Sequence, residues 1–264
     1  MSWIENIYAR NSSAEANRRE RFPDKAASIA RHPVQGGAGF KMALRGKVAP
    51  SVIAEIKFAS PSQGVIRARN DVEAVAESYA SAGAAALSVL TEEEHFGGHL
   101  SFIERAKTSS GLPVLRKDFL ATPRDIAESS NAGADAVLLI ARFLSRETLA
   151  EMISKTYELG LSALVEVHGE DDLQRTAGLP IEIIGVNHRN LETLCLDMGL
   201  SEQIAPLLPE GVTRVAESGL STGRQLRKMA ALGYDAVLIG TAFMGDNEPG
   251  EALARLIGET RDSN

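Results

Sequence analysis

The 264-residue sequence contains one cysteine, Cys195, so no disulfide can form within the chain. Scarce cysteine fits a reducing compartment. No stretch reaches the roughly 18 consecutive apolar residues that a membrane-spanning helix needs. The N-terminal residues MSWIENIYARNSSAEANRRER lack the apolar core of a signal peptide, and their acidic residues argue against a transit peptide. We therefore expect a cytoplasmic protein with no membrane partner.

The sequence also lacks an excess of basic residues. It has 28 Lys and Arg against 35 Asp and Glu, a formal net charge of −7. This argues against nucleic acid as a partner, because binding its phosphate backbone needs a broad basic face. A small anionic ligand in a locally positive pocket remains possible. The five histidines, at positions 32, 95, 99, 168 and 188, have no metal-ligand spacing, so we expect no metal.

Short apolar segments rich in β-branched residues alternate with helical patterns from about residue 47. Their near-continuous apolar character is typical of parallel strands buried on both faces. Helices are predicted at 71–83 and 145–160, with Asp71 and Ser145 as N-caps, and at 222–233 and 248–259. Strands are predicted at 52–58, 86–91, 113–119, 136–141, 162–168, 181–189, 213–219 and 236–244.

Eight strands alternating with helices predict an α/β protein, a (β/α)8 TIM barrel. A doubly wound open sheet is the alternative, but the G-x-G-x-x-G dinucleotide motif is absent after the first strand. Residues 1–46 are polar and rich in Arg, Ala and Ser, and they include HPVQGGAG. We expect them to form an N-terminal helical extension of one or two helices and a loop, packed on a catalytic barrel of residues 47–264.

Charged side chains recur where the predicted strands end. In VIAEIKFASPSQG (52–64), Glu55 and Lys57 share one face of the first strand just before it stops. Such charges are costly in an apolar core unless they are paired. At the mouth of a barrel they can meet the charges of other strands and shift one another's pKa values. Later strands end with Lys117, Glu166, Asn187, Arg189 and Glu217.

Two neighbours of these residues receive other roles. Asp118 points away from the face of Lys117 and is expected to be structural. His168 shares the face of Glu166 but lies beyond it, and we do not expect it to take part directly in the chemistry.

Small residues after the last two strands suggest a phosphate site. Ser218-Gly219 and Gly240-Thr241 offer backbone N–H groups and hydroxyls where barrels of this class often bind phosphate. The alternative is ordinary turn chemistry. Lys57 could add charge, and the loop SPS (60–62) adds hydroxyls. Phe96 and Phe119 could be core residues or could form a wall for a flat aromatic ligand.

Eight motifs, one on each strand unit, resemble the indole-3-glycerol phosphate synthase family of tryptophan biosynthesis over about residues 40–258. They are EIKFASPSQGVI, LTEEEHFGG, LRKDF, GADAVLLIA, LVEVH, IGVNHRNL, VAESG and DAVLIGTAFM. The resemblance implies a (β/α)8 barrel with an extra N-terminal helical segment. It also implies a lyase that converts the small phosphorylated substrate 1-(2-carboxyphenylamino)-1-deoxyribulose 5-phosphate to indole-3-glycerol phosphate, with loss of CO₂ and water and without cofactor or metal. We expect a monomer or a weak homo-oligomer.

The resemblance also implies roles for single residues. Lys117 is the general acid for ring closure, and Glu166 stabilises the positive charge and helps proton removal. Glu55 and Lys57 are polar partners, with Lys57 also near phosphate, and Glu217 and Asn187 orient the substrate. Ser60 and Arg189 are placed to bind the anthranilate carboxylate. An apolar wall of Phe96, Phe119 and Leu138 surrounds the aromatic ring. The phosphate is bound by Ser218, Gly219, Gly240 and Thr241.

Three positions depart from the usual pattern of the family. Phe58 stands where Arg is usual, Gln63 where Lys is frequent, and His188 where a small or polar residue is usual. Less positive charge in the first loop predicts weaker substrate binding. Alternatives are a paralogous phosphate-binding barrel enzyme that acts on a modified anthranilate or another sugar phosphate, such as an isomerase, and a barrel that binds a ligand without turnover.

Overall fold

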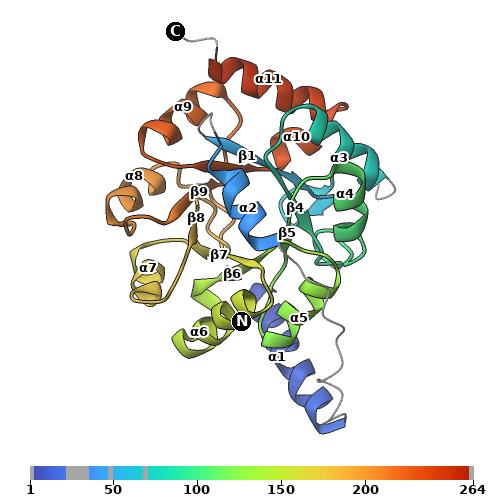
Figure 1. Ribbon diagram of the computed structural model, residues 1–264, viewed down its shortest axis with the longest axis vertical. Coiled ribbons are helices and arrows are strands. Elements are labelled where there is room, and N and C mark those ends of the chain that lie inside the picture. Colours follow the sequence, from blue (N-terminus) through green and yellow to red (C-terminus); the bar gives the residue numbers. More distant parts are fainter. Residues whose placement is uncertain (1–2, 22–35, 47–49, 68–70, 262–264) are drawn as a thin grey trace.

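The computed structural model describes residues 3–21, 36–46, 50–67 and 71–261 and has the form of a closed parallel barrel surrounded by helices (Figure 1). The strands pair in the cyclic order β1-β10-β9-β8-β7-β6-β5-β4, as predicted for a (β/α)8 fold. They are β1 (Ser51–Ile56), β4 (Ala86–Leu90), β5 (Val114–Lys117), β6 (Ala136–Ile140), β7 (Ser162–Val167), β8 (Ile183–Asn187), β9 (Thr213–Glu217) and β10 (Ala236–Ile239).

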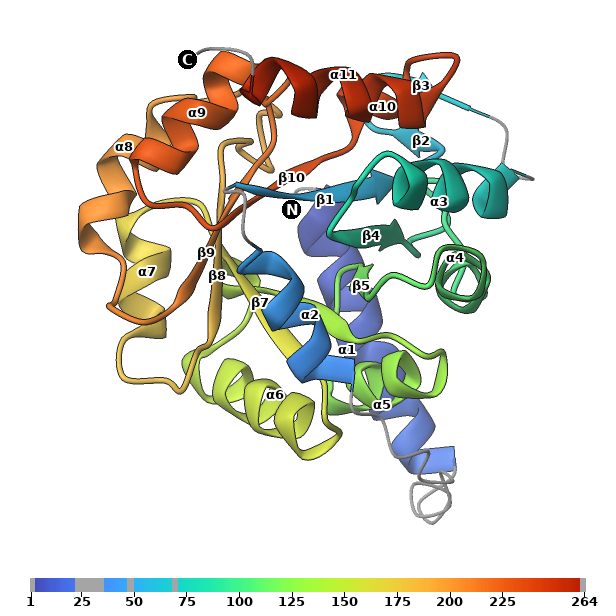
Figure 2. The ribbon, with the colours of Figure 1, turned by 45° about the horizontal axis from the view of Figure 1, so that its top comes forward.

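The helices cover the outside of the barrel (Figure 2). They are α3 (Val72–Ser81), α4 (Phe102–Ser110), α5 (Pro123–Asn131), α6 (Arg146–Glu158), α7 (Glu170–Thr176), α8 (Leu200–Ile204), α9 (Gly223–Ala231) and α11 (Pro249–Arg261). Short additions are α10 (Thr241–Met244), the 3-10 turns η3 (Ala141–Phe143) and η4 (Ala205–Leu207), and an antiparallel hairpin of β2 (Ala59–Ser60) and β3 (Gly64–Val65).

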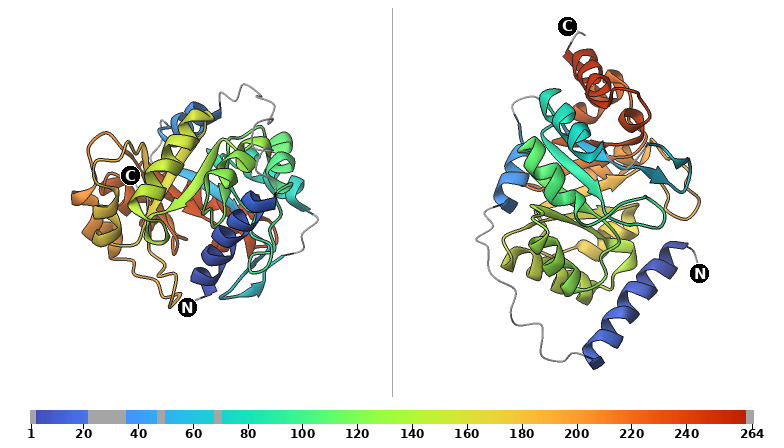
Figure 3. Two further views of the ribbon diagram at one scale, coloured as in Figure 1. Left: turned by 90° about the horizontal axis from the view of Figure 1, so that it is seen from below. Right: turned by 90° about the vertical axis from the view of Figure 1, so that its right-hand side faces the viewer.

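The two helices of the N-terminal segment lie on opposite sides of the barrel (Figure 3, right). Helix α1 (Trp3–Arg21) contacts the end at which the strands finish, where Asn11 Nδ2 donates to the carbonyl of Phe119 over 2.9 Å. Helix α2 (Gly36–Leu44) covers the other end, and Phe40 is fully buried there. A Cβ at Gly37 would lie 2.6 Å from the Gly160 carbonyl oxygen, so only glycine permits this close approach.

The predicted boundary between residues 46 and 47 lies at residues 47–49, which are outside the described part of the chain, and the division there remains a prediction. Within the described ranges, no helix is both long and apolar enough to cross a membrane.

The structure corrects three predictions of local structure. The strand predicted at 236–244 ends at Ile239, and the apolar residues after Gly240 form α10 instead, with Phe243 and Met244 buried. The Asp71 side chain does not cap α3, because it pairs with Arg67 Nε at 2.7 Å. Four short helices, α4, α5, α7 and α8, were not predicted. In contrast, the cap at Ser145 is confirmed, since its side chain accepts from the Thr148 N–H.

Candidate active site

A cavity of about 440 Å³ opens at the C-terminal ends of the strands, within the usual range of about 300–1,000 Å³ for ligand sites. Nearly every side chain predicted for the site lines it. These residues are Glu55, Lys57, Phe96, Lys117, Phe119, Leu138, Glu166, Asn187, Arg189, Glu217, Ser218, Gly219, Gly240 and Thr241. Ser60 is not among the lining residues. It is buried in the β2–β3 hairpin, with its Oγ 3.4 Å from Ser62 Oγ.

Lys117 forms the centre of the charged cluster. Its Nζ donates to Glu166 Oε2 over 2.8 Å and to Glu217 Oε2 over 2.9 Å. Both carboxylates are almost completely buried, so little water competes for them. Three strands bring these residues together: β5 ends at Lys117, β9 ends at Glu217, and Glu166 is the second-last residue of β7. The expected convergence of strand-end charges is present.

The two carboxylates beside Lys117 have different proton affinities. Burial opposes the charge on Glu166, but Lys117 and His168 outweigh it and hold the pKa of that carboxyl well below its usual range. Burial raises the pKa of Glu217 to about 8, and Lys117 only partly offsets this while the charge of Glu166 adds to it. At neutral pH, Glu166 is therefore ionised and Glu217 holds a proton.

The pKa of Lys117 is raised in spite of its burial. Burial alone would lower it, but the neighbouring carboxylates, Glu166 first, outweigh that effect and raise the pKa well above the ordinary lysine value. Lys117 therefore remains an ammonium group. An ammonium has three N–H donors, of which the carboxylates accept two.

Two glycines make room for the buried carboxylates, and the sequence analysis missed the first of them. A Cβ at Gly185 would lie 2.2 Å from Glu217 Oε1, and a Cβ at Gly240 would lie 2.1 Å from Glu55 Oε2. Any larger residue would push these carboxylates out of place. A glycine in the middle of an apolar strand, as in IIGVN, is the sequence signal that a backbone or side chain approaches closely at this point.

Lys57 connects the acidic cluster to the predicted phosphate site. Its Nζ lies 2.8 Å from Glu55 Oε2 and donates to Thr241 Oγ1 over 3.1 Å. Thr241 is the first residue of α10, directly after Gly240. The ammonium group of Lys57 can therefore reach both a reacting group near Glu55 and an anion near Thr241.

The turn after β9 has an unusual backbone, which His188 holds in place. Ser218 and Gly219 have positive φ values of 68° and 75°, a conformation that is uncommon for serine. His188 is buried, its Nδ1 lies 2.8 Å from the Ser218 carbonyl oxygen, and its Nε2 lies 2.6 Å from Ser201 Oγ. Burial lowers the pKa of His188, so the ring is neutral and donates to the carbonyl through Nδ1–H.

Aromatic rings close one side of the cavity. The ring centroids of Phe96 and Phe119 lie 6.1 Å apart, and both residues line the cavity, which favours the predicted wall. Trp3 of α1 supports both rings from outside, with centroid distances of 6.2 Å and 5.8 Å. Its role was not predicted, because the polar pattern of residues 1–21 does not show where α1 packs.

Polar residues at the end of β8 and just after it line the same cavity. Asn187 Oδ1 accepts from the Arg189 N–H over 3.0 Å, and Arg189 Nη1 donates to the Leu194 carbonyl over 2.9 Å. The second bond fixes the direction of the guanidinium of Arg189, and this residue lines the cavity. The arrangement fits recognition of a carboxylate by Arg189.

Phe58 lies outside the cavity lining. Its side chain is buried and packs edge-on against Phe102, with ring centroids 5.7 Å apart. This placement argues against a direct effect of Phe58 on substrate binding, and the weaker binding expected from it stays a prediction. Gln63 does line the cavity, where its side chain carries no charge.

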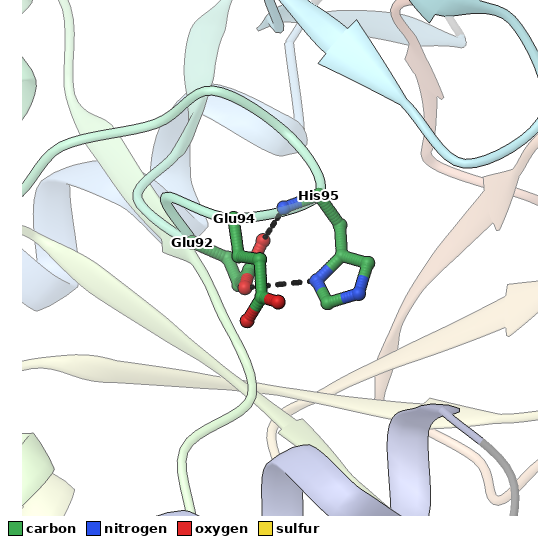
Figure 4. A group of neighbouring side chains, drawn as sticks. All are labelled: Glu92, Glu94 and His95. Atoms are coloured by element: carbon green, nitrogen blue, oxygen red, sulfur yellow. Dashed lines mark hydrogen bonds and ion pairs between the residues drawn. The ribbon is translucent and has the colours of Figure 1, made fainter.

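Three neighbouring side chains, Glu92, Glu94 and His95, have the geometry of a possible metal site (Figure 4). Arg10 of α1 pairs with this group, since its guanidinium lies 2.9 Å from Glu94 and 4.0 Å from Glu92. Glu92 Oε2 also accepts from the backbone N–H groups of His95 and Phe96. The group therefore fastens α1 to the loop after β4.

Comparisons with known proteins agree with this geometry. Residues 4–256 match the family model described as indole-3-glycerol phosphate synthase. The chain is 42% identical over 255 residues to the indole-3-glycerol phosphate synthase of Koribacter versatilis (strain Ellin345), covering 96% of this chain and 95% of that protein. It is 44% identical over 205 residues to the enzyme of that name from Sulfurimonas denitrificans, covering 78% of each.

The structure also resembles solved structures of more distant proteins. A 3-hexulose-6-phosphate synthase aligns with a TM-score of 0.63 at 18% identity, covering 79% of this chain and 99% of that chain. At this level of identity, the likeness shows a shared barrel fold.

Proposed function

Because the chain belongs to the indole-3-glycerol phosphate synthase family, it is a decarboxylating lyase of tryptophan biosynthesis, and we propose that the side chains around Lys117 carry out its ring closure, decarboxylation and dehydration. The observation that carries this assignment is the ammonium of Lys117 held between two carboxylates in a cavity of suitable size.

Lys117 is the general acid of ring closure. The aromatic ring of the substrate attacks the ribulose carbonyl carbon, and the carbonyl oxygen gains the charge of an alkoxide. An alkoxide is basic enough to take a proton from an ammonium group, even one whose pKa is raised. Glu166 and Glu217 accept two N–H bonds of Lys117, which leaves the third for the carbonyl oxygen.

Glu166 stabilises the positive charge that ring attack creates on the substrate. An ionised carboxylate fixed in a buried site is effective in this role, because it needs no reorganisation when the charge appears. Loss of CO₂ then returns a pair of electrons to the ring and removes the positive charge. The low pKa of Glu166 supports this role, because the group stays ionised over the whole neutral range.

Glu55 and Lys57 form the second acid–base pair, which assists the loss of the hydroxyl as water. They lie 2.8 Å apart and line the same cavity as Lys117. Departure of water needs a proton on the leaving oxygen and a base for the proton lost from the ring system. Asn187 and Glu217 orient the substrate and its hydroxyls from the neighbouring strands.

The substrate is held at its two ends. Lys57, Thr241, Gly240, Ser218 and Gly219 bind the phosphate, and the direct contact of Lys57 with Thr241 supports this placement. Arg189 binds the anthranilate carboxylate while Phe96, Phe119 and Leu138 contact the aromatic ring. Ser60 was predicted to share the carboxylate, but its absence from the cavity lining leaves that contact to Arg189.

A single-turnover experiment tests the division of these roles. Enzyme in excess is mixed with the carboxyphenylamino-deoxyribulose phosphate, and CO₂ release and indole formation are followed together. Lys117→Met should release neither, because ring closure precedes both. Glu55→Gln should release CO₂ faster than it forms indole. Equal loss of both signals in Glu55→Gln would remove the assignment of Glu55 to dehydration.

The same proposal extends to the assembly and location of the chain. We propose that the chain works as a monomer or a weak homo-oligomer. The lone cysteine supports work in the cytoplasm.

A further inference from the structure

His168 lies within a line of alternating charges behind the active site. From β5 to η3 the line comprises Lys117, Glu166, His168, Asp172 and Arg142. His168 Nε2 is 3.2 Å from Glu166 Oε1, and His168 Nδ1 is 3.6 Å from Asp172 Oδ2. Arg142 Nε is 3.4 Å from the same Asp172 oxygen, and Lys117 contacts the opposite oxygen of Glu166. The inner part of this line is dry, since the side chains of His168 and Asp172 are only 2% and 5% exposed.

Local structure fixes the position of the imidazole. His168 follows directly after β7, two residues beyond Glu166, so both side chains point to the same face. Asp172 lies in the first turn of α7 and accepts the backbone N–H of His168 over 2.8 Å. The same carboxylate therefore holds the backbone and attracts the ring of His168.

The two carboxylates on Lys117 differ in the presence of this second cation. Glu166 has a cation near each oxygen: Lys117 at Oε2 and His168 at Oε1. Glu217 has only Lys117, at Oε2, and its buried Oε1 has no hydrogen-bond partner among the described residues. Two carboxylates so close together cannot both be ionised cheaply in a buried site.

We propose that His168 is a positioning residue that assigns the negative charge beside Lys117 to Glu166 rather than to Glu217. This inference rests on the proposed function, because it concerns which carboxylate faces the cationic intermediate. A charged imidazole is consistent with the raised pKa of His168. Burial opposes the charge, but the neighbouring carboxylates of Asp172 and Glu166 outweigh it and bring the pKa to about 9. Without His168, Glu166 and Glu217 would compete for one negative charge.

His168→Gln tests this inference, because glutamine keeps a polar side chain of similar reach and removes the charge. The kcat should fall by about 10- to 100-fold, the usual effect of removing an outer partner of a functional group, with KM changed by less than about threefold. Adding Glu217→Gln should cost less kcat in this variant than in the wild type, because Glu166 then has no competitor for the charge. His99→Gln is the matched control, since His99 pairs with the exposed Glu93 and should leave kcat unchanged.

The outcomes separate this inference from the function itself. No turnover by the wild-type protein would refute the proposed function. If the wild-type protein is active and the kcat of His168→Gln is within twofold of the wild-type value, the inference is overturned. An equal cost of Glu217→Gln in the wild type and in His168→Gln would also overturn it, because a purely structural role of His168 predicts no coupling between the two sites. If His168→Gln does not fold, Asp172→Asn serves as the second variant. It keeps an acceptor for the His168 N–H and should lower kcat in the same direction, and an unchanged kcat would overturn the inference.

Discussion

Replacing Gly185 with alanine tests whether the buried carboxylate of Glu217 depends on a missing side chain. The new Cβ would lie 2.2 Å from Glu217 Oε1 and 3.3 Å from Leu164 Cδ1. Atoms in ordinary contact are more than 3 Å apart, so the carboxylate must move by about 1 Å or more. That movement breaks the 2.9 Å bond to Lys117. Overpacking of this kind costs about 1–3 kcal/mol of unfolding free energy.

The assay combines urea unfolding with steady-state kinetics. Gly185→Ala should lose about 1–3 kcal/mol of stability and at least about tenfold in kcat, which corresponds to about 1.4 kcal/mol of transition-state stabilisation. In a Glu217→Ala background the clash partner is gone, so the stability cost of Gly185→Ala should nearly vanish. Gly258→Ala in α11 is the control. No atom lies within 4 Å of its new Cβ, and it should stabilise the protein by about 0.5–1 kcal/mol.

Two results would refute this reasoning. One is a Gly185→Ala protein with wild-type stability and wild-type kcat. The other is a stability cost that remains in the Glu217→Ala background, because then the clash would involve another group, such as Leu164.

Three further predictions concern the surroundings of the site. Phe58→Arg should lower the free energy of unfolding in urea by about 1–3 kcal/mol, since it places a charge in a buried aromatic contact. It should not lower KM, and a lower KM would contradict this placement of residue 58. His188→Ala should raise KM about tenfold, which corresponds to the free energy of about one hydrogen bond, because the Ser218 carbonyl loses its bond to the ring. An unchanged KM would argue against this role of His188. The pKa of His168 is raised from 6.5 to about 9, so its charge contributes about 3 kcal/mol to the free energy of unfolding below pH 6.5. This contribution is lost as the pH rises through 9. His168→Gln should therefore abolish the fall in unfolding free energy that urea titrations show between pH 6.5 and 9, and a fall that persists in the variant would contradict this.

The barrel was predictable because its strands are short apolar segments separated by polar turns. Each predicted strand overlaps an observed one, although all eight predictions ran past the observed C-terminal end. Periodicity cannot show where a strand stops when the next residues are also apolar, as Thr241–Met244 demonstrate. The missed helix α5 did carry a signal, since Thr122, Pro123 and Asp125 form a capping box with proline at the first turn.

The charged residues of the site were predictable because barrel topology brings strand ends together. Their pairing was not, since Lys117 meets partners 49 and 100 residues away. The role of Gly185 was also hidden, because the space it leaves for Glu217 depends on the register of β8 and β9. Alternation from Glu55 and Lys57 puts Phe58 on the opposite face, in agreement with its burial against Phe102.

The most direct test of the central claim is the growth of indole fluorescence when the carboxyphenylamino-deoxyribulose phosphate is added to purified protein. The protein is produced in a host that lacks its own enzyme for this step, and wild type and Lys117→Met are compared at equal concentration without added metal. Fluorescence should grow with the wild type and stay flat with a Lys117→Met protein that shows cooperative unfolding. Near-normal growth with Lys117→Met would contradict the assignment of Lys117 as the acid.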